Sequence, residues 1–202
     1  PSASKHTLTS LFKEIEEYSL KVRILPGLAE LAQGKILVSE LKEVDVEDLL
    51  GRREVEANQT LLKKNIFGKV VLITGAGGSI GSEISRQVVK HKASKVILLD
   101  SNEYSLFTIK NEIKQMNSNS GIYSVLGNVT NKKRIMDVLS AFEVQTVYHA
   151  AAYKHVSIVE ENPFEAVYNN ILGTKICVNS AIETKVETFV LISTDKAVRP
   201  TN

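Results

Sequence analysis

The sequence has little cysteine, little net charge and no long hydrophobic run. Its single cysteine, Cys177, excludes an internal disulfide framework and argues against a cysteine-based zinc site. The 25 Lys and Arg residues nearly balance the 23 Asp and Glu residues, and the formal charge of +2 is too small to indicate capture of nucleic acid or of an anionic membrane. No run of about 18 apolar residues is present, and the first residues do not resemble a signal peptide. We therefore expect a soluble, cytoplasmic chain that binds no nucleic acid and makes no direct membrane contact.

The composition of the 202 residues changes near residue 66. Residues 1–38 contain one helical pattern and one short strand pattern, which bury too little surface to fold alone, so we expect the tail of an upstream α/β domain or a packing arm. Residues 39–66 are crowded with charged side chains and are predicted to be a linker. Residues 67–202 show regular apolar periodicity and are predicted to form a dinucleotide-binding domain.

Five short apolar strands alternate with amphipathic helices in this domain. Such an alternation is typical of a parallel sheet covered on both faces, so the predicted fold class is α/β, a Rossmann-type doubly wound sheet. The helical stripe of Val167, Ile171 and Leu172 is expected in the core, as are His149 and Cys177. The predicted strands are Val70–Thr74, Lys95–Leu99, Ile122–Leu126, Thr146–His149 and Thr188–Ser193.

A glycine-rich loop, TGAGGSIG at residues 74–81, follows the first predicted strand. It fits the pattern G-x-x-G-x-x-G at Gly75, Gly78 and Gly81, whereas G-x-G-x-x-G would require a small residue at Ile80. Glycines here allow a tight turn and bring bare backbone against a pyrophosphate, while the next helix directs free N–H groups at the phosphates. No Gly-Lys-Ser/Thr follows, so a nucleoside-triphosphate P-loop is excluded.

Asp100 ends the second predicted strand, 19 residues after Gly81. A carboxylate at this place accepts hydrogen bonds from the ribose hydroxyls of adenosine. The residues that follow, Ser101 to Glu103, include no Arg or Lys that could receive a 2′-phosphate, so NAD is favoured over NADP as the cofactor. The alternative is a glycine turn beside a surface aspartate.

Further motifs resemble the extended short-chain dehydrogenase/reductase superfamily and, within it, the nucleotide-sugar 4,6-dehydratases of bacterial polysaccharide and glycan biosynthesis. They are NILGT at residues 170–174, HAAAYKHV at 149–156, EENP at 160–163 and STDKAVRPTN at 193–202. VEDLLGR at residues 46–52 is similar to the segment before the catalytic domain in the membrane-anchored branch of that family. The resemblance implies NAD-dependent dehydration of a UDP-sugar, UDP-N-acetylglucosamine in most members, and a full-length protein anchored at the inner face of the cell membrane.

The resemblance also implies roles for individual residues. Asp195 is the acid that helps the C6 hydroxyl depart, Lys196 is the base at C5, and Thr194 is the partner of the C4 oxygen; a solvated strand end is the alternative. Lys154 and His155 follow the fourth predicted strand and are expected to meet the sugar or its phosphates, with a surface lysine and a capping histidine as the alternative. The residues expected to bind the cofactor are Gly75, Gly77, Gly78, Ser79, Ile80, Gly81, Asp100, Ser101, Asn128, Val129, Ala150, Ala151, Ala152 and Asn170.

The sequence departs from the family pattern in two important places. Asn128 stands where the superfamily often carries an Asp near the adenine, although an amide can also hydrogen-bond the base. The sequence ends at Asn202, before the Tyr- or Met-x-x-x-Lys segment of the family, so we expect a domain that is incomplete at its C-terminus and turns over nothing by itself.

Two other functions and several structural questions stay open. A UDP-sugar epimerase or reductase would share the loop and the fold, and a non-catalytic NAD-binding fragment is the alternative outside the enzymes. No spacing of His, Cys, Asp or Glu predicts a metal site. The oligomeric state is undetermined, a homo-oligomer included.

Overall fold

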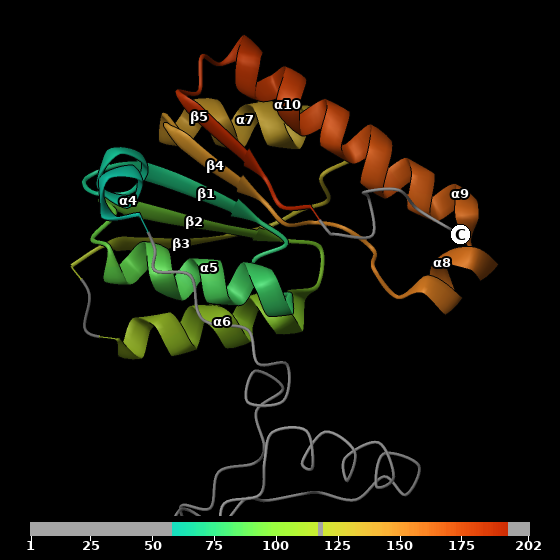
Figure 1. The fold of residues 1–202 in the computed structure, drawn as a ribbon, viewed down its shortest axis with the longest axis horizontal. Helices are drawn as coiled ribbons and strands as arrows, with labels where there is room; N and C mark the ends of the chain where they lie inside the picture. The colour runs from blue at the N-terminus through green and yellow to red at the C-terminus, as the bar shows by residue number, and fades with distance from the viewer. Residues whose placement is uncertain (1–57, 117–118, 194–202) are drawn as a thin grey trace, which may run out of the picture. The chain divides into compact units, whose positions relative to one another are not determined.

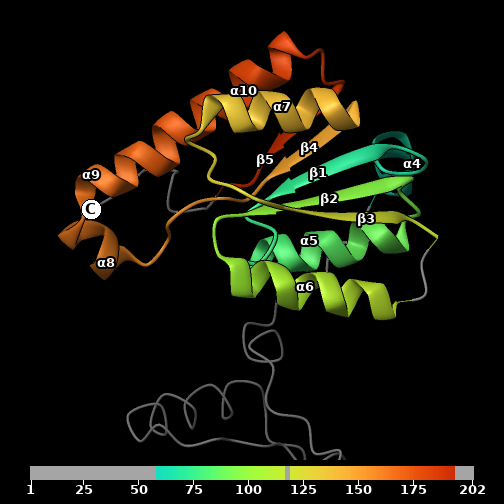
Figure 2. The same ribbon diagram turned by 180° about the vertical axis from the view of Figure 1, so that it is seen from behind.

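The computed structural model describes residues 58–116 and 119–193, which fall within one compact unit, Ala57–Asn202. The predicted α/β class is confirmed. Five parallel strands form one sheet in the order β3-β2-β1-β4-β5, with helices on both faces (Figures 1 and 2). The strands are β1 (Val70–Thr74), β2 (Lys95–Asp100), β3 (Gly121–Leu126), β4 (Thr146–His149) and β5 (Thr188–Leu191). The helices are α4 (Gln59–Asn65), α5 (Ser79–Lys90), α6 (Glu103–Gln115), α7 (Lys132–Phe142), α8 (Val156–Glu161), α9 (Pro163–Ala166), the π-helical segment η2 (Val167–Gly173) and α10 (Thr174–Glu183).

The alternation of side chains along the strands builds two cores, one on each face of the sheet. In β1, Val71 and Ile73 pack toward α5 and α6, whereas Leu72 packs toward α7 and α10. Successive strand residues point to opposite faces, and both faces are covered, so the central strands are apolar without interruption. Residues 71 to 74 of β1 are all buried.

The order of the strands places a ligand crevice at one edge of the sheet. Strand β1 pairs with β2 on one side and with β4 on the other, so the chain runs outward from β1 through β2 to β3 and then crosses to β4 and β5 on the other side. In open parallel sheets, ligands bind outside the carboxyl ends of the strands at this reversal. The loops after β1, β2, β3 and β4 all lie at this edge (Figure 1).

The boundary of the domain lies earlier than predicted. Residues 59–65, expected in the linker, form helix α4, and Ile66 is buried in the core that includes α5 and α6. The side chain of Asn58 caps this helix by accepting hydrogen bonds from the backbone N–H groups of Thr60 and Leu61. The sequence did not predict this helix because it has only seven residues and none of them is buried, so no clear apolar stripe marks it.

The predicted core position of the stripe Val167, Ile171 and Leu172 is wrong. These side chains are 54%, 64% and 38% exposed. The helix formed by α9, η2 and α10 projects past the carboxyl edge of the sheet, so the strands that would cover its first turns are not beneath it (Figure 1). Helical periodicity identified an apolar face but not what that face meets.

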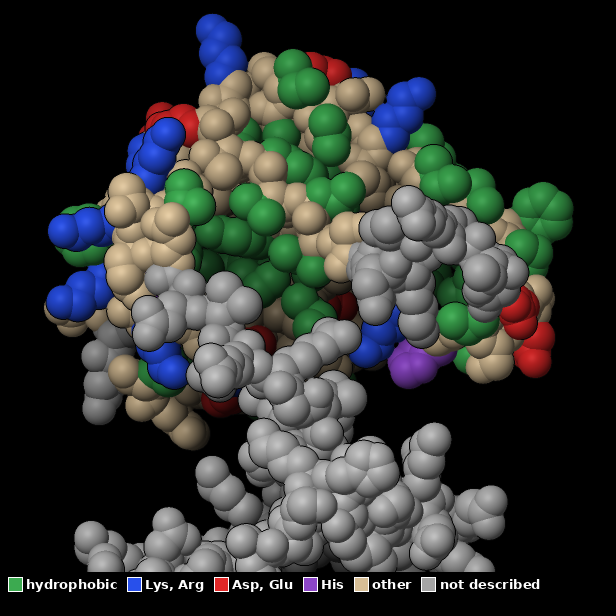
Figure 3. All heavy atoms as spheres, viewed as in Figure 1, with side chains coloured by type: hydrophobic (Ala, Val, Ile, Leu, Met, Phe, Trp, Pro, Cys, Tyr) green, Lys and Arg blue, Asp and Glu red, His purple; other side chains and the backbone are tan. Residues whose placement is uncertain are grey.

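Strand β5 is an edge strand with an incompletely covered apolar surface. It ends at Leu191, two residues earlier than predicted, and Leu191 is 52% exposed. Figure 3 shows hydrophobic side chains gathered in the middle of the face that this edge presents. The outer strand is therefore packed less fully than β1 and β2, whose central residues are buried.

Candidate functional site

Three glycines of the loop after β1 are required by close packing of the chain against itself. Gly75 has φ +67°, a conformation that side chains disfavour, and a Cβ there would lie 2.7 Å from the carbonyl oxygen of Ala150. A Cβ on Gly77 would lie 2.5 Å from the Cβ of Ser105, and a Cβ on Gly81 would overlap the carbonyl oxygen of Gly75. The loop, helix α6 and the loop after β4 are therefore in contact through bare backbone.

Gly78 differs from these three because its open side faces a pocket. Its nearest protein neighbour, for an added Cβ, is the carbonyl oxygen of Gly75 at 3.3 Å. Gly78 is also the N-cap of α5, and no side chain of the described residues caps that helix. Helices α4, α6 and α7 instead begin with a capping asparagine, Asn58, Asn102 and Asn131 respectively. The first-turn N–H groups of α5 thus stay available to an anion.

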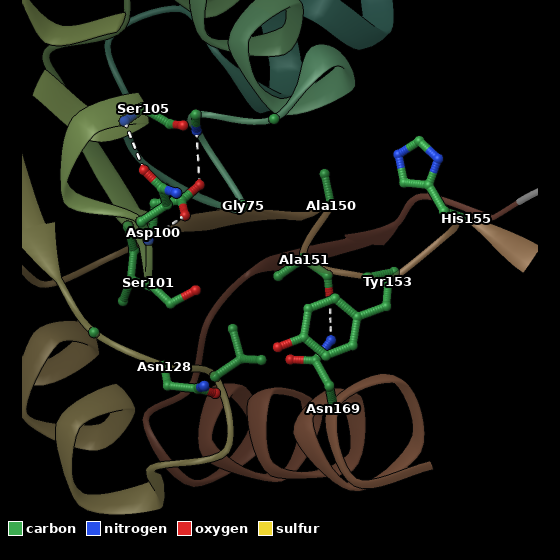
Figure 4. Close-up of a pocket in the computed structure, with 17 residues that line it drawn as sticks. Gly75, Asp100, Ser101, Ser105, Asn128, Ala150, Ala151, Tyr153, His155 and Asn169 are labelled. Atoms are coloured by element: carbon green, nitrogen blue, oxygen red, sulfur yellow. Dashed lines mark hydrogen bonds between the residues drawn. The ribbon is translucent and has the colours of Figure 1, made fainter. Parts of the chain in front are cut away.

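The carboxylate of Asp100 lies beside the glycine loop at the end of β2. Its Oδ2 accepts a hydrogen bond from the Gly77 N–H at 2.8 Å, and its Oδ1 accepts one from the Asn102 N–H at 2.8 Å (Figure 4). Each carboxylate oxygen can accept a further hydrogen bond. Asp100 therefore both fixes the loop and keeps acceptor capacity toward the pocket that it lines.

One pocket of about 500 Å³ collects most of the predicted cofactor residues at the carboxyl edge of the sheet. Figure 4 shows Asp100 and Ser101 at one end of it and Tyr153 with Asn169 toward the other. The predicted residues that line it are Gly75, Gly77, Gly78, Asp100, Ser101, Asn128, Val129, Ala150, Ala151 and Ala152, together with His155. The lining residues that the sequence analysis missed are Leu99, Asn102, Ser105, Gly127, Tyr153 and Asn169.

Most of the missed residues had no signal of their own in the sequence. Asn102 was the exception, since an asparagine before a helical pattern is a typical N-cap, and its Oδ1 accepts the Ser105 N–H at 2.9 Å. Ser105 lines the pocket because Gly77 packs against it, a contact that spans two elements. Such contacts are not readable from local spacing.

Asn128 has part of its side chain committed to the fold. Its Oδ1 accepts hydrogen bonds from both the backbone N–H and the hydroxyl of Thr130, each at 2.9 Å, in the turn that precedes α7. The amide Nδ2 group is then the part of Asn128 suited to donate to a ligand. Asn128 would therefore donate a hydrogen bond to a ligand through Nδ2, whereas an Asp at this position could only accept one.

A second pocket, of about 560 Å³, adjoins the first and contains both Lys154 and His155. Its wall also includes Ser79 and Glu165, while Gly78, Ala152, Tyr153 and His155 line both pockets. Charged and polar side chains therefore meet the helix N-terminus of α5 on this side. The predicted residues Ile80 and Gly81 line neither pocket, and Ile80 is 52% exposed on α5.

Asn170, predicted to bind the cofactor, lines neither pocket and instead holds the wall between them. Its Oδ1 accepts the Tyr153 N–H and its Nδ2 donates to the Tyr153 carbonyl oxygen, both at 2.9 Å. The neighbouring Asn169 lines the first pocket and donates through Nδ2 to Asn170 Oδ1 at 2.9 Å. A direct contact of Asn170 with a cofactor stays a prediction.

The buried titratable side chains near the site are uncharged at neutral pH. Burial lowers the pKa of His149 to about 4, and His149 contacts the hydroxyls of Thr74 (2.7 Å) and Thr174 (3.0 Å). Burial also raises the pKa of the Cys177 thiol to about 12, so this thiol is not a nucleophile. The predicted burial of both residues is confirmed.

The predicted catalytic residues Thr194, Asp195 and Lys196 lie outside the described residues. Strand β5 ends at Leu191, before this segment begins, which the predicted roles require because adjacent strand residues point to opposite faces. Ser193, the last described residue, follows β5 where β5 runs parallel to β4. The chain therefore leaves β5 at the same edge of the sheet as the glycine loop.

Among residues 58–116 and 119–193, no helix is both long enough and apolar enough to span a membrane. Within those two ranges, His, Cys, Asp and Glu side chains form no group of three or more that could hold a metal ion.

Several curated proteins are similar to this chain in sequence. Capsular polysaccharide biosynthesis protein CapD of Staphylococcus aureus is 44% identical over 203 residues, covering 100% of this chain and 34% of the relative. A UDP-N-acetylglucosamine 4,6-dehydratase (inverting) of Campylobacter jejuni is 35% identical over 67% of this chain and 39% of the relative. A UDP-glucose 4-epimerase of Rickettsia prowazekii is 35% identical over 66% of this chain and 39% of the relative. The chain thus spans 34% to 39% of the length of these curated relatives.

A solved structure and a family model agree with these relatives. The X-ray structure of Pen from Bacillus thuringiensis has a TM-score of 0.62 and 36% identity, covering 68% of this chain and 40% of that one. The model of a family described as polysaccharide biosynthesis protein matches residues 71–202, which include the glycine loop, both pockets and the end of β5. The chain therefore belongs to the polysaccharide biosynthesis protein family.

Proposed function

We propose that the complete protein is an NAD-dependent dehydratase that converts a UDP-sugar, with UDP-N-acetylglucosamine as the first candidate, to its 4-keto-6-deoxy derivative. The observation that carries the proposal is the arrangement of one helix N-terminus between two pockets. Gly78, the N-cap of α5, lines the pocket that holds Asp100, and Gly78 together with Ser79 lines the adjoining pocket that holds Lys154 and His155. The similarity to a UDP-N-acetylglucosamine 4,6-dehydratase supports the choice of reaction.

The residues of the first pocket fit NAD part by part. The bare face of Gly78 and the N–H groups of α5 suit the pyrophosphate, because a helix N-terminus attracts anions. Asp100 suits the adenosine ribose, and the Nδ2 group of Asn128 suits the adenine. Tyr153 would then lie toward the nicotinamide end, where the two pockets meet.

The same pocket favours NAD over NADP. The described residues that line it include Asp100 and no lysine or arginine. A 2′-phosphate on the ribose would face the Asp100 carboxylate without a cation to offset the repulsion. We expect the complete protein to bind NAD more tightly than NADP when the two are titrated separately.

The proposed chemistry assigns a proton to each of two residues that follow β5. When bound, NAD would accept a hydride from C4 as the C4 hydroxyl loses its proton to solvent, and the resulting C4 ketone makes the C5 proton removable. Lys196 takes that proton, while Asp195 donates a proton to the C6 hydroxyl, so that water departs and a C5–C6 double bond forms. The hydride would then return to C6 while Lys196 returns a proton to C5, which completes the 4-keto-6-deoxy sugar. A lysine with an ordinary pKa of about 10.4 must be uncharged to act in this way, which burial favours. Thr194 hydrogen-bonds the C4 oxygen.

The test is incubation of the full-length protein with UDP-N-acetylglucosamine and NAD, followed by mass spectrometry of the sugar nucleotide. Dehydration gives a product lighter by one water molecule. Lys196→Met keeps the length of the side chain without a base, and we expect it to abolish turnover while NAD binds normally. Unimpaired turnover by Lys196→Met would contradict the assigned base, and the absence of any lighter product would contradict the reaction.

Epimerisation of a UDP-sugar is the second candidate, favoured by the 35% identity to a UDP-glucose 4-epimerase. Both reactions begin with oxidation at C4, but epimerisation needs no acid at the C6 hydroxyl. The same incubation separates them. An epimerase gives a product of unchanged mass and inverted C4 configuration, and its turnover would survive Asp195→Asn.

A further inference from the structure

A line of side-chain hydrogen bonds crosses the domain from the end of β1 to the wall between the two pockets. It begins at Thr74, whose hydroxyl lies 2.7 Å from Nδ1 of His149. Nε2 of His149 lies 3.0 Å from the hydroxyl of Thr174, which donates to the carbonyl oxygen of Asn170 at 2.6 Å. The side chain of Asn170 then holds the backbone of Tyr153 from both sides. The line thus joins β1, β4, α10, the π-helical segment η2 and the pocket wall.

The positions of the protons along this line follow from its last member. A carbonyl oxygen only accepts hydrogen bonds, so the single proton of the Thr174 hydroxyl points to Asn170. The Thr174 oxygen must then accept from His149, which places the ring proton on Nε2. Nδ1 is left as an acceptor for the Thr74 hydroxyl. One neutral tautomer of His149 satisfies every contact, whereas an imidazolium would require the Thr74 hydroxyl to turn and accept a hydrogen bond from Nδ1–H instead of donating one.

We propose that His149 is a positioning residue for the cofactor pocket, held as the neutral Nε2–H tautomer and acting through Thr174 and Asn170 on the backbone of Tyr153. The inference rests on the proposed function in one respect, namely that the pocket beside Tyr153 receives NAD. His149 itself is 2% exposed and lines neither pocket, so it acts only through its partners.

The position of Asn170 explains why such support is needed. The Asn170 amide pairs with the Tyr153 N–H and carbonyl oxygen as a neighbouring strand would. Asn170 lies in the π-helical segment η2, where the helix carries a wider turn, and π-helical turns often occur at functional sites. The hydroxyl of Thr174 occupies the Asn170 carbonyl oxygen, and His149 fixes that hydroxyl. Loss of the hydroxyl would therefore loosen the residue that clamps Tyr153.

The chain offers a matched control for this hydroxyl. Thr184 is the C-cap of α10, the helix that begins at Thr174. Its hydroxyl also donates to the carbonyl oxygen four residues earlier, that of Ser180 at 2.8 Å, but His149 is not among its hydrogen-bond partners. We therefore compare Thr174→Val, Thr174→Ser and Thr184→Val in the full-length protein. Both valine variants remove a hydroxyl that donates to a carbonyl oxygen, but Thr174→Val also leaves the buried Nε2–H of His149 without its acceptor, so we expect the larger loss of thermal stability in Thr174→Val. Only Thr174→Val should weaken NAD binding, by about tenfold, and Thr174→Ser should restore it.

Two measurements test the proposal independently of NAD. We expect hydrogen exchange of the Tyr153 amide to become faster in Thr174→Val and to stay unchanged in Thr184→Val. We also expect ¹H–¹⁵N spectra of the unmodified protein at neutral pH to show a protonated Nε2 and an unprotonated Nδ1 for His149. An Nδ1–H tautomer, an imidazolium, or equal effects of the two valine variants on Tyr153 would overturn the inference. If the unmodified protein bound no NAD, the proposed function would fail, while these two measurements would still decide the role of His149.

Discussion

The two walls of the cofactor pocket are built by different means. On the side of β1, the glycine loop contacts Ala150 and Ser105 at distances that leave no room for a Cβ. On the side of β4, the backbone of Tyr153 is held by the side chain of Asn170, and His149 supports that contact through Thr174. The first wall is rigid because backbone meets backbone, and the second depends on the direction of a few protons. The difference predicts which substitutions damage folding and which damage binding alone.

The largest loss of stability should follow a substitution in the first wall. In Gly81→Ala, the added Cβ would overlap the Gly75 carbonyl oxygen, and neither backbone can move without opening the loop. We expect the free energy of unfolding to fall by about 3 kcal/mol or more, measured by urea denaturation. Ser82→Ala, on the same helix turn, is the control and should change it by less than about 1 kcal/mol. Equal stability of the two variants would mean that the loop is not closely packed.

The contribution of the second wall to the free energy of unfolding should depend on pH through His149. His149 has a folded-state pKa of about 4, against about 6.5 in the unfolded chain, so the unfolded state binds the additional proton as the pH falls from 6.5 to 4. Its contribution to stability is present above pH 6.5 and is lost through this window. Between pH 7 and pH 4.5 we expect a loss of roughly 2–3 kcal/mol from this residue.

Denaturation of the unmodified protein and of His149→Asn at both pH values isolates that contribution. The variant lacks the titrating group, so its stability should fall by less over the same range. Carboxylates titrate in both proteins and cancel in the comparison. The same pH dependence in both would show that His149 is not the residue responsible.

Gly78 separates binding from folding within the first wall. An alanine Cβ would lie 3.3 Å from the Gly75 carbonyl oxygen, a contact that a small shift relieves, but it would project into the space assigned to the pyrophosphate. We expect Gly78→Ala to weaken NAD binding by at least about tenfold and to lower stability by less than about 1 kcal/mol. Titration calorimetry and urea denaturation of one preparation measure both. Normal NAD binding by Gly78→Ala would contradict the proposed seat of the phosphates.

The smallest loss of stability should follow removal of an ion pair on the surface where α5 contacts α6. Arg86 of α5 contacts Glu112 of α6 through Nε at 2.6 Å and through Nη2 at 3.1 Å, and it contacts Glu83 at 2.8 Å. Hydrogen bonds from Gln87 and then from Arg86 lower the pKa of Glu83, and those from Arg86 lower the pKa of Glu112. Both carboxylates are exposed to solvent, and the Arg86 side chain is partly exposed. We expect Arg86→Gln to lower the free energy of unfolding by about 1 kcal/mol or less, with the difference shrinking as salt is added. A large loss that is independent of salt would show that packing of α5 on α6 depends on this ion pair.

The success of the sequence analysis differed between elements for physical reasons. Strands β1 and β4 were predicted to the residue because both are short and rich in β-branched or aromatic side chains, which favour strands. Helix α4 was missed because it has only seven residues and none of them is buried, and it meets the domain through contacts with distant segments, such as those of Leu62 and Asn65. The stripe of η2 was placed in the core because periodicity reports that a face is apolar without reporting what covers it.

The candidate site shows the same division. Glycines and Asp100 were identified because a bare backbone and a carboxylate at a fixed spacing have few other purposes after a strand. Tyr153, Asn169 and Ser105 were missed because each contacts a residue that is distant in the chain, Asn170, Ala151 and Gly77 respectively. Asn170 was recognised within a motif, but its clamp on Tyr153 depends on the path of the loop after β4.

The sequence by itself determined the α/β class, the strands and the glycine loop, since local periodicity and the conformational freedom of glycine are properties of consecutive residues. The tertiary structure alone decided which glycines of the loop leave no room for a Cβ, and which nitrogen of His149 carries the proton. Those outcomes depend on distances between β1, β4 and α10, segments separated by up to a hundred residues, and no local pattern encodes such distances.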